Sequence, residues 1–208
     1  MYLTKTPDFL KPIAADLVWD IATDKNEVFL TFDDGPHPEI TPQVLEILAP
    51  FNAKATFFCV GKNAEKYPEV IEKILAAGHA IGNHTYNHES GWESGQYSYL
   101  KSYLQCRSVI DSTLFRPPYG RIKRDQVKAL KPRCKIIMWD VLSGDFDPKR
   151  TPERCAATVL KHTKPGSIVV FHDSEKAKTN VLGALPVVLE ELAKRGVVFR
   201  ALEMKAPL

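Results

Sequence analysis

The sequence predicts an α/β protein built around a mostly parallel sheet of about seven strands. Short apolar runs alternate with helix-like segments along the chain, and this alternation is typical of βα units. Glycine and proline mark many of the boundaries between the two kinds of segment. Polar clusters follow several apolar runs, at the carboxyl ends of the expected strands, where α/β proteins place functional groups. The pattern suits a closed barrel and an open doubly wound sheet equally.

Seven apolar runs of strand length are expected to form the sheet. They cover residues 27–32, 53–58, 80–82, 114–116, 135–139, 167–171 and 197–200. Six helical segments lie between them, at residues 40–50, 62–77, 96–112, 123–131, 151–162 and 180–195. Thr151 before Pro152 is a typical helix start, and Gly196 stands where a glycine commonly ends a helix.

The composition indicates a globular protein of 208 residues, large enough for one domain with a full core. The net charge of +3 is too small and too dispersed to indicate a nucleic-acid partner. Four cysteines without a Cys-x-x-Cys pair predict neither a disulfide framework nor a thiolate zinc site. No stretch is long enough to span a bilayer, and residues 1–20 lack the apolar core of a signal peptide. We therefore expect a cytoplasmic protein, or an export signal that lies outside this sequence.

The end of the first expected strand carries two adjacent carboxylates. The apolar run ends at Asp33 and Asp34, and Gly35-Pro36 turns the chain immediately afterwards. Burying two carboxylates is costly unless a cation compensates them. Successive strand side chains point to opposite faces, so the two groups should have different partners. This arrangement suits one carboxylate that binds a metal and another that moves a proton.

Two histidines with a three-residue spacing supply further candidate metal ligands. If residues 84–88 form one helical turn, His84 and His88 share a face and can reach one ion. Asp34 would complete a His₂Asp set with open coordination positions, as a catalytic metal requires. Such donors suit zinc, although cobalt, nickel or iron also fit. His37 is a weaker ligand candidate, and His79 is expected to be structural or exposed rather than a ligand.

Three motifs in this order resemble the polysaccharide deacetylases of the NodB-homology type, carbohydrate esterase family 4. Residues 31–36 match the family's first motif, the two histidines match the second, and the run Arg-Pro-Pro-Tyr-Gly at residues 116–120 matches the third. The resemblance implies a distorted (β/α) barrel with fewer strands than the eight of a TIM barrel. Residues 27–208 would form the catalytic domain, and residues 1–26 an extension packed on the barrel.

The resemblance also implies a role for each matched residue. The metal ligands would be Asp34, His84 and His88. The catalytic group would comprise Asp33 as general base, Arg116 to orient it, His172 as general acid and Asp145 to support that histidine. Substrate contacts would come from Pro118, Tyr119, Trp139 and Val170, with the Tyr119 N–H at the oxyanion. Leu142 and Phe146 depart from the fourth motif, which puts the pocket shape in question more than the chemistry.

The implied activity is that of a metal-dependent hydrolase acting on linear amides. It would remove N-acetyl groups from an amino sugar in peptidoglycan, a chitin-like oligomer or another glycan, and release acetate by attack of a water that the metal activates. Two alternatives stay open: a related amidohydrolase acting on a small cyclic amide or imide, and an inactive carbohydrate-binding domain. A groove open at both ends would favour a glycan substrate, whereas a binding domain has no need of acid and base groups.

Overall fold

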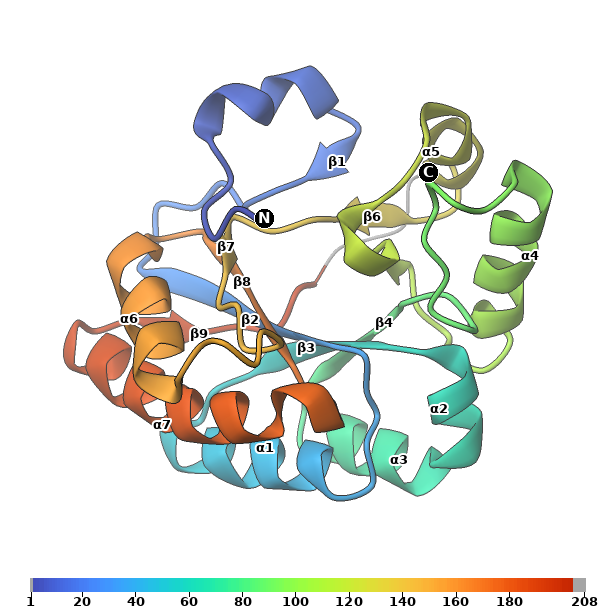
Figure 1. Ribbon diagram of the computed structural model, residues 1–208. Coiled ribbons are helices and arrows are strands. Elements are labelled where there is room, and N and C mark those ends of the chain that lie inside the picture. The colour runs from blue at the N-terminus through green and yellow to red at the C-terminus, as the bar shows by residue number, and fades with distance from the viewer. Residues whose placement is uncertain (1, 204–208) are drawn as a thin grey trace.

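A curled parallel sheet forms the centre of the protein, seen in a computed structural model that describes residues 2–203 (Figure 1). Its strands are β1 (Leu17–Val18), β2 (Glu27–Asp33), β3 (Ala55–Cys59), β4 (Ala80–Asn83), β5 (Leu114–Phe115), β6 (Lys135–Ile137), β7 (Val141–Leu142), β8 (Ile168–His172) and β9 (Val198–Phe199). The order across the sheet is β1-β6-β5-β4-β3-β2-β8-β7, and β9 pairs with the start of β2. All pairings between these strands are parallel. The prediction of a distorted (β/α) barrel is confirmed, although nine strands pair in the described residues where about seven were expected.

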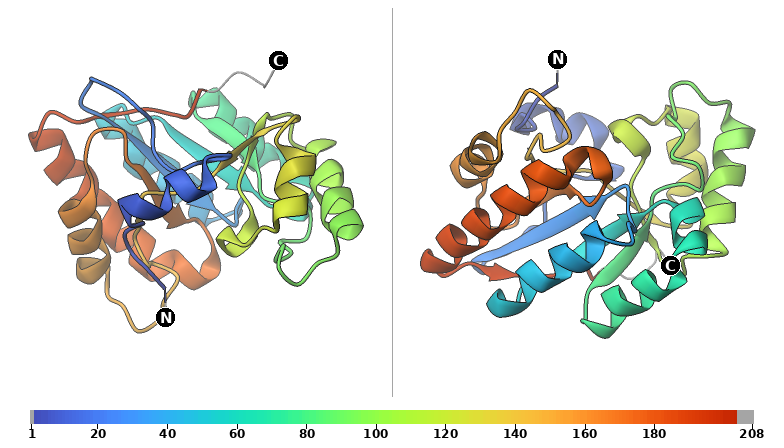
Figure 2. Two further views of the ribbon diagram at one scale, coloured as in Figure 1. Left: turned by 90° about the horizontal axis from the view of Figure 1, so that it is seen from above. Right: turned by 60° about the horizontal axis from the view of Figure 1, so that its bottom comes forward.

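Helices cover the outer face of the sheet (Figure 2). They are α1 (Ile40–Leu48), α2 (Gly61–Lys66), α3 (Pro68–Ala76), α4 (Gln96–Arg107), α5 (Arg124–Leu130), α6 (Pro152–His162) and α7 (Lys178–Lys194). The single helix expected over residues 62–77 is divided into α2 and α3. Tyr67 leaves the helical region at φ −130° because the residue before a proline is disfavoured there, and Pro68 then starts α3.

All seven expected strands are present, and two short ones were not expected. β1 and β7 each span only two residues, so neither produces a recognisable period in the sequence. Both form by pairing with strands that are distant in the chain: β1 with β6, and β7 with β8. Tertiary contacts therefore decided these two elements.

The residues of β2 show why the two faces of the sheet differ. Leu30 and Phe32 point outward and belong to the large apolar cluster formed with α1, α3, α6 and α7. Phe29 points inward, where it joins a smaller cluster with Phe58. Alternation along the strand therefore places Thr31 and Asp33 on the same inner face, above that apolar floor. The inner face leads from an apolar base to a polar rim.

The N-terminal residues lie between the two edges of the curled sheet, in dark blue in Figure 1. Val18 in β1 pairs with β6, and Lys5 forms an antiparallel bridge to Val141 in β7. The division into residues 1–26 and 27–208 stays a prediction, and residues 1 and 204–208 lie outside the described part. Among the described residues, no helix is long and apolar enough to cross a bilayer. All four cysteines are buried and free.

Candidate active site

Three side chains predicted to bind a metal converge at the carboxyl end of the sheet. Asp34 directly follows β2, and His84 and His88 follow β4. The Asp34 Oδ1 atom lies 2.9 Å from His88 Nε2 and 3.6 Å from His84 Nε2. One donor atom from each residue lies within 4.8 Å of the others. This donor set can hold one divalent ion of the zinc type.

The electrostatic surroundings of Asp34 favour its ionised form. Burial alone would raise the pKa of Asp34, but hydrogen bonds from His84 and His88 and the charge of His172 hold that pKa well below its usual range. A carboxylate that stays ionised is the form that ligates a cation. The charge state of Asp34 therefore suits metal binding across the physiological pH range.

The segment between the two histidines is an irregular loop and not the helical turn that was considered for this spacing. Thr85 and His88 have φ values of 59° and 62°, in the left-handed region. The Asn83 side chain accepts a hydrogen bond from the Thr85 backbone N–H at 2.9 Å and stabilises this turn. The loop still brings the two imidazole rings to 5.0 Å between centroids. The spacing of the histidines was informative although the local structure inferred from it was not.

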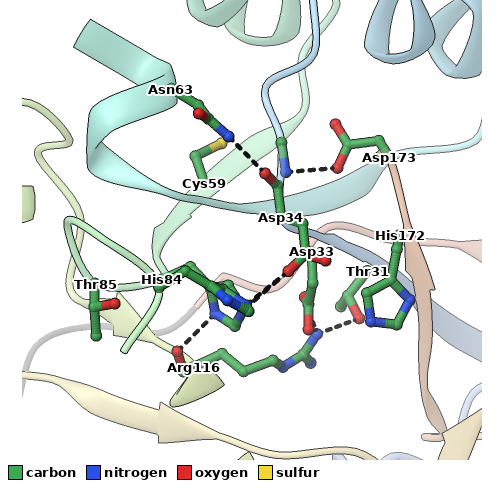
Figure 3. Close-up of polar contacts among 12 residues, drawn as sticks. Thr31, Asp33, Asp34, Cys59, Asn63, His84, Thr85, Arg116, His172 and Asp173 are labelled. Atoms are coloured by element: carbon green, nitrogen blue, oxygen red, sulfur yellow. Dashed lines mark hydrogen bonds and ion pairs between the residues drawn. The ribbon is translucent and has the colours of Figure 1, made fainter. Parts of the chain in front are cut away.

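Neighbouring groups fix the orientation of the proposed ligands (Figure 3). His84 Nδ1–H donates to the Arg116 carbonyl at 2.8 Å, which turns Nε2 toward Asp34. The Asn63 side chain donates to the Asp34 carbonyl at 2.9 Å. Metal-ligating histidines commonly donate their second nitrogen to such an acceptor. The residues around the trio therefore fit a resident metal.

Asp33, the second carboxylate of the pair, contacts a fully buried arginine instead. Arg116 donates to Asp33 Oδ1 and to Thr31 Oγ1, each at 2.7 Å. It also donates to the carbonyls of Met138 at 2.9 Å and Ile137 at 3.3 Å. Figure 3 shows the Asp33 carboxylate directed at this guanidinium, whereas the Asp34 carboxylate lies toward His84. The expected division of partners between the two aspartates is present in the geometry.

His172, at the end of β8, is held by Asp145. The two carboxylate oxygens of Asp145 accept hydrogen bonds from the backbone N–H and from Nδ1 of His172, each at 2.7 Å. Burial of the ring would lower the pKa of His172. The charge and hydrogen bond of Asp145, together with Asp34 and Asp33, outweigh burial and raise that pKa to about 9. The imidazole is therefore protonated at neutral pH.

A cavity of ≈ 620 Å³ joins these groups at the rim of the sheet. Its walls include the three metal-ligand candidates, Asp33, His172 and three of the four expected substrate contacts: Tyr119, Trp139 and Val170. Pro118, the fourth, is buried and is not among the residues that line the cavity. Leu142 and Phe146, which depart from the fourth motif, both line it.

Asp173 is a buried residue of this site that the sequence interpretation did not assign. Its carboxylate accepts from the Gly35 N–H at 3.1 Å and contacts Thr41 Oγ1 at 2.5 Å. A Cβ at Gly35 would lie 2.1 Å from Asp173 Oδ2, so only glycine fits at this turn. Burial, together with the charges of Asp34 and Asp33, raises the pKa of Asp173 to about 7. Its place directly after His172, at a strand end, is the sequence signal that could have found it.

Two other histidines have structural contacts. His37 Nδ1 accepts from the backbone N–H groups of Glu39 and Ile40, at the start of α1. His79 is buried, and its Nδ1 accepts from the Ala55 N–H at 3.0 Å. Burial beside a lysine lowers the pKa of His79 to about 4. His79 therefore packs as a neutral ring, as expected for a structural residue.

Comparisons with known proteins agree with this geometry. Residues 20–132 match the sequence model of the polysaccharide deacetylase family. A peptidoglycan-N-acetylglucosamine deacetylase of Bacillus cereus is 34% identical over 84% of this chain and 66% of its own length. A chitooligosaccharide deacetylase of Azorhizobium caulinodans is 32% identical over 88% of this chain and 95% of its own length.

A solved structure extends the likeness to three dimensions. The peptidoglycan N-acetylglucosamine deacetylase Bc1960, in complex with a naphthalenyl N-oxidanylbenzamide, superposes with a TM-score of 0.86 at 31% identity. The match covers 92% of this chain and 95% of that structure. The sequence match, the shared fold and the aligned relatives lead to one conclusion: this chain belongs to the polysaccharide deacetylase family, carbohydrate esterase family 4.

Proposed function

We propose that the protein is a metal-dependent deacetylase that hydrolyses the acetamido group of an amino sugar in a glycan and releases acetate. The observation that carries this proposal is the placement of two proton-handling groups around one metal-ligand trio. Asp33 and His172 are register partners on the adjacent strands β2 and β8, and both line the cavity. Asp33 contacts the Arg116 guanidinium and His172 contacts the Asp145 carboxylate, and such a pair of oppositely partnered groups suits acid–base catalysis.

Asp33 is suited to the role of general base. The Arg116 guanidinium contacts Oδ1 of Asp33 and places a positive charge beside it. The second carboxylate oxygen of Asp33, Oδ2, is not part of this contact. An ionised carboxylate can accept the proton of an attacking water. When bound, a zinc-type ion would supply Lewis acidity toward the water and the acetyl carbonyl.

His172 is suited to the role of general acid. Nδ1 is engaged by Asp145, so Nε2–H is the group left to protonate the departing nitrogen. The pKa of about 9 keeps this proton in place at neutral pH. Asp145 fixes the ring orientation and stabilises the imidazolium, as a buried carboxylate does for a catalytic histidine.

Tyr119 and Val170 complete the proposed site around the acetyl group. Tyr119 has a φ of 60°, and its ring packs edge-on against His88 with centroids 4.7 Å apart. This anchors the backbone from which the Tyr119 N–H would stabilise the oxyanion. Val170 lines the cavity from β8, and we place the acetyl methyl group against it.

Glycans are the substrate class that the relatives' names support, and zinc is the ion that the donor set supports best. Peptidoglycan, chitin oligomers, poly-N-acetylglucosamine and lipid-linked sugars are the candidates to compare. A small cyclic amide is the second candidate, but nothing in the described residues favours it.

Acetate release from these four substrates, with elemental analysis of protein purified without chelators, tests the proposal. We expect about one equivalent of transition metal per chain and acetate from at least one glycan. A protein that carries stoichiometric metal but hydrolyses only small amides would contradict the assignment of a glycan substrate. Absence of any transition metal would contradict the proposed mechanism itself.

A further inference from the structure

The N-terminal segment, residues 2–20, joins the two open edges of the curled sheet. On one edge, the Leu142 N–H donates to the Thr4 carbonyl and the Thr6 N–H to the Asp140 carbonyl, each at 2.9 Å. On the other edge, the Met138 N–H donates to the Val18 carbonyl at 2.7 Å. The segment thus fills the gap between β6 and β7, which lie on opposite sides of the opening in the curled sheet. The match to the family model begins only at residue 20, so the N-terminal segment lies almost entirely outside the matched region.

A buried ion cluster fixes the segment in place. Asp140 is fully buried, and its Oδ1 atom contacts Lys5 Nζ at 2.5 Å and Lys11 Nζ at 2.7 Å. Its Oδ2 atom accepts from Ser167 Oγ at 2.7 Å. A buried carboxylate with two ammonium partners holds the chain more firmly than exposed ion pairs do. The segment is therefore a fixed part of the site.

Tyr2 and Leu3 of this segment line the same cavity as the metal-ligand candidates. The Tyr2 hydroxyl donates to Asp147 at 2.8 Å, which fixes its ring 5.0 Å from the ring of Phe146. Phe146 in turn lies edge-on to the His172 ring at 5.1 Å. An aromatic and aliphatic wall therefore extends from the proposed general acid to the exposed side chains of Tyr2 and Leu3.

The chemistry of the site indicates what this wall contacts. Under the proposed function, His172 protonates the leaving nitrogen, and that nitrogen remains attached to the sugar ring. The sugar must therefore lie on the His172 side of the cavity, against Phe146 and the N-terminal segment. Aromatic faces and edges pack well against the apolar C–H surface of such a ring. We propose that Tyr2 and Leu3 form the sugar-contacting wall of the cleft and determine how tightly the glycan is held.

Substitution of Tyr2 tests this inference, which rests on the proposed function. For Tyr2→Ala we expect KM for the β-1,4-linked N-acetylglucosamine tetramer to rise about five- to twentyfold, the loss of one aromatic contact, with kcat changed less than about twofold. Tyr2→Phe keeps the ring and should recover most of the lost affinity. Phe9→Ala is the matched control, because Phe9 is an exposed aromatic residue of the same segment that is not part of the cavity lining.

Binding without turnover separates this inference from the proposed function. The tetramer is titrated calorimetrically into an Asp33→Asn protein, with and without Tyr2→Ala, and the dissociation constants should differ by about the same factor as KM. If the tetramer binds equally well to Asp33→Asn with and without Tyr2→Ala, and the Tyr2→Ala single variant turns over normally, the role of Tyr2 is overturned. The proposed function would stand. Failure of the tetramer to bind either protein, with no acetate released by the wild type, would overturn both.

Discussion

Replacement of Arg116 by methionine is the sharpest test of the buried ion pair that Arg116 forms with Asp33. Methionine keeps the length and the apolar character of the side chain but removes the guanidinium and its four hydrogen bonds. Asp33, which is 4% exposed, would be left as a buried charge without its cationic partner. Breaking a buried ion pair by removing one partner costs about 3–5 kcal/mol, because an uncompensated charge stays inside.

The four lost hydrogen bonds give a consistent magnitude. Bonds to charged groups contribute about 1.5–3 kcal/mol each, but the variant no longer has to desolvate a guanidinium, so the net loss is smaller than their sum. For a chain of this size, a loss of about 3–5 kcal/mol lowers the melting temperature by about 6–20 °C. Urea unfolding followed by circular dichroism measures the loss directly.

The same variant separates the base from the metal site. The Arg116 backbone carbonyl, which orients His84, is retained, so we expect metal content to be unchanged. Turnover should fall at least about a hundredfold because Asp33 loses its orientation. The double variant Asp33→Asn/Arg116→Met should be more stable than Arg116→Met alone, since no lone charge remains. An Arg116→Met protein that unfolds within about 1 kcal/mol of the wild type, or that loses its metal, would refute this account.

Further substitutions divide the site by role. His84→Ala or Asp34→Ala should abolish stoichiometric metal in elemental analysis. Asp33→Asn should keep the metal and lose acetate release. Acetate release by Asp33→Asn would exclude Asp33 as the general base. His172→Ala should slow turnover with unchanged metal content, and wild-type rates would exclude it from the mechanism. The wild-type rate should fall as pH rises through about 9, where His172 loses its proton. Asp145→Asn removes the charge that raises this pKa, so the fall should move to lower pH; an unmoved profile would contradict the pairing.

Stability has a related pH dependence with a defined sign. The pKa of His172 is about 9 in the folded protein, above the value of about 6.5 expected when unfolded. The Asp145–His172 pair therefore stabilises the fold fully below about pH 6.5, and this contribution declines as pH rises toward 9. Because the ring is largely buried, the decline should be measurable by urea unfolding at pH 6 and pH 9.5. An Asp145→Asn protein should show a weaker decline over that range.

The functional strands could be predicted well because their signals are local. β2 and β8 are long apolar runs that end in charged residues, and burial of one or both faces produces such runs. β1 and β7 could not be predicted, because two residues carry no period and their pairing partners lie far away in the chain. The break between α2 and α3 was readable in principle from Pro68, but helical periodicity on both sides obscured it.

The sequence by itself determined the chemical inventory of this protein: a paired carboxylate at a strand end, two spaced histidines, a motif arginine and a strand-end histidine. Residue type and spacing limit the available chemistry, so these were visible without coordinates. Only the tertiary structure decided how that inventory is held. The Arg116 carbonyl accepts a hydrogen bond that orients His84, and the Asp173 carboxylate accepts one from the Gly35 N–H. Asp140 forms ion pairs with two lysines of the N-terminal segment. Each contact joins residues distant in the chain, and chain folding alone determines which of them meet.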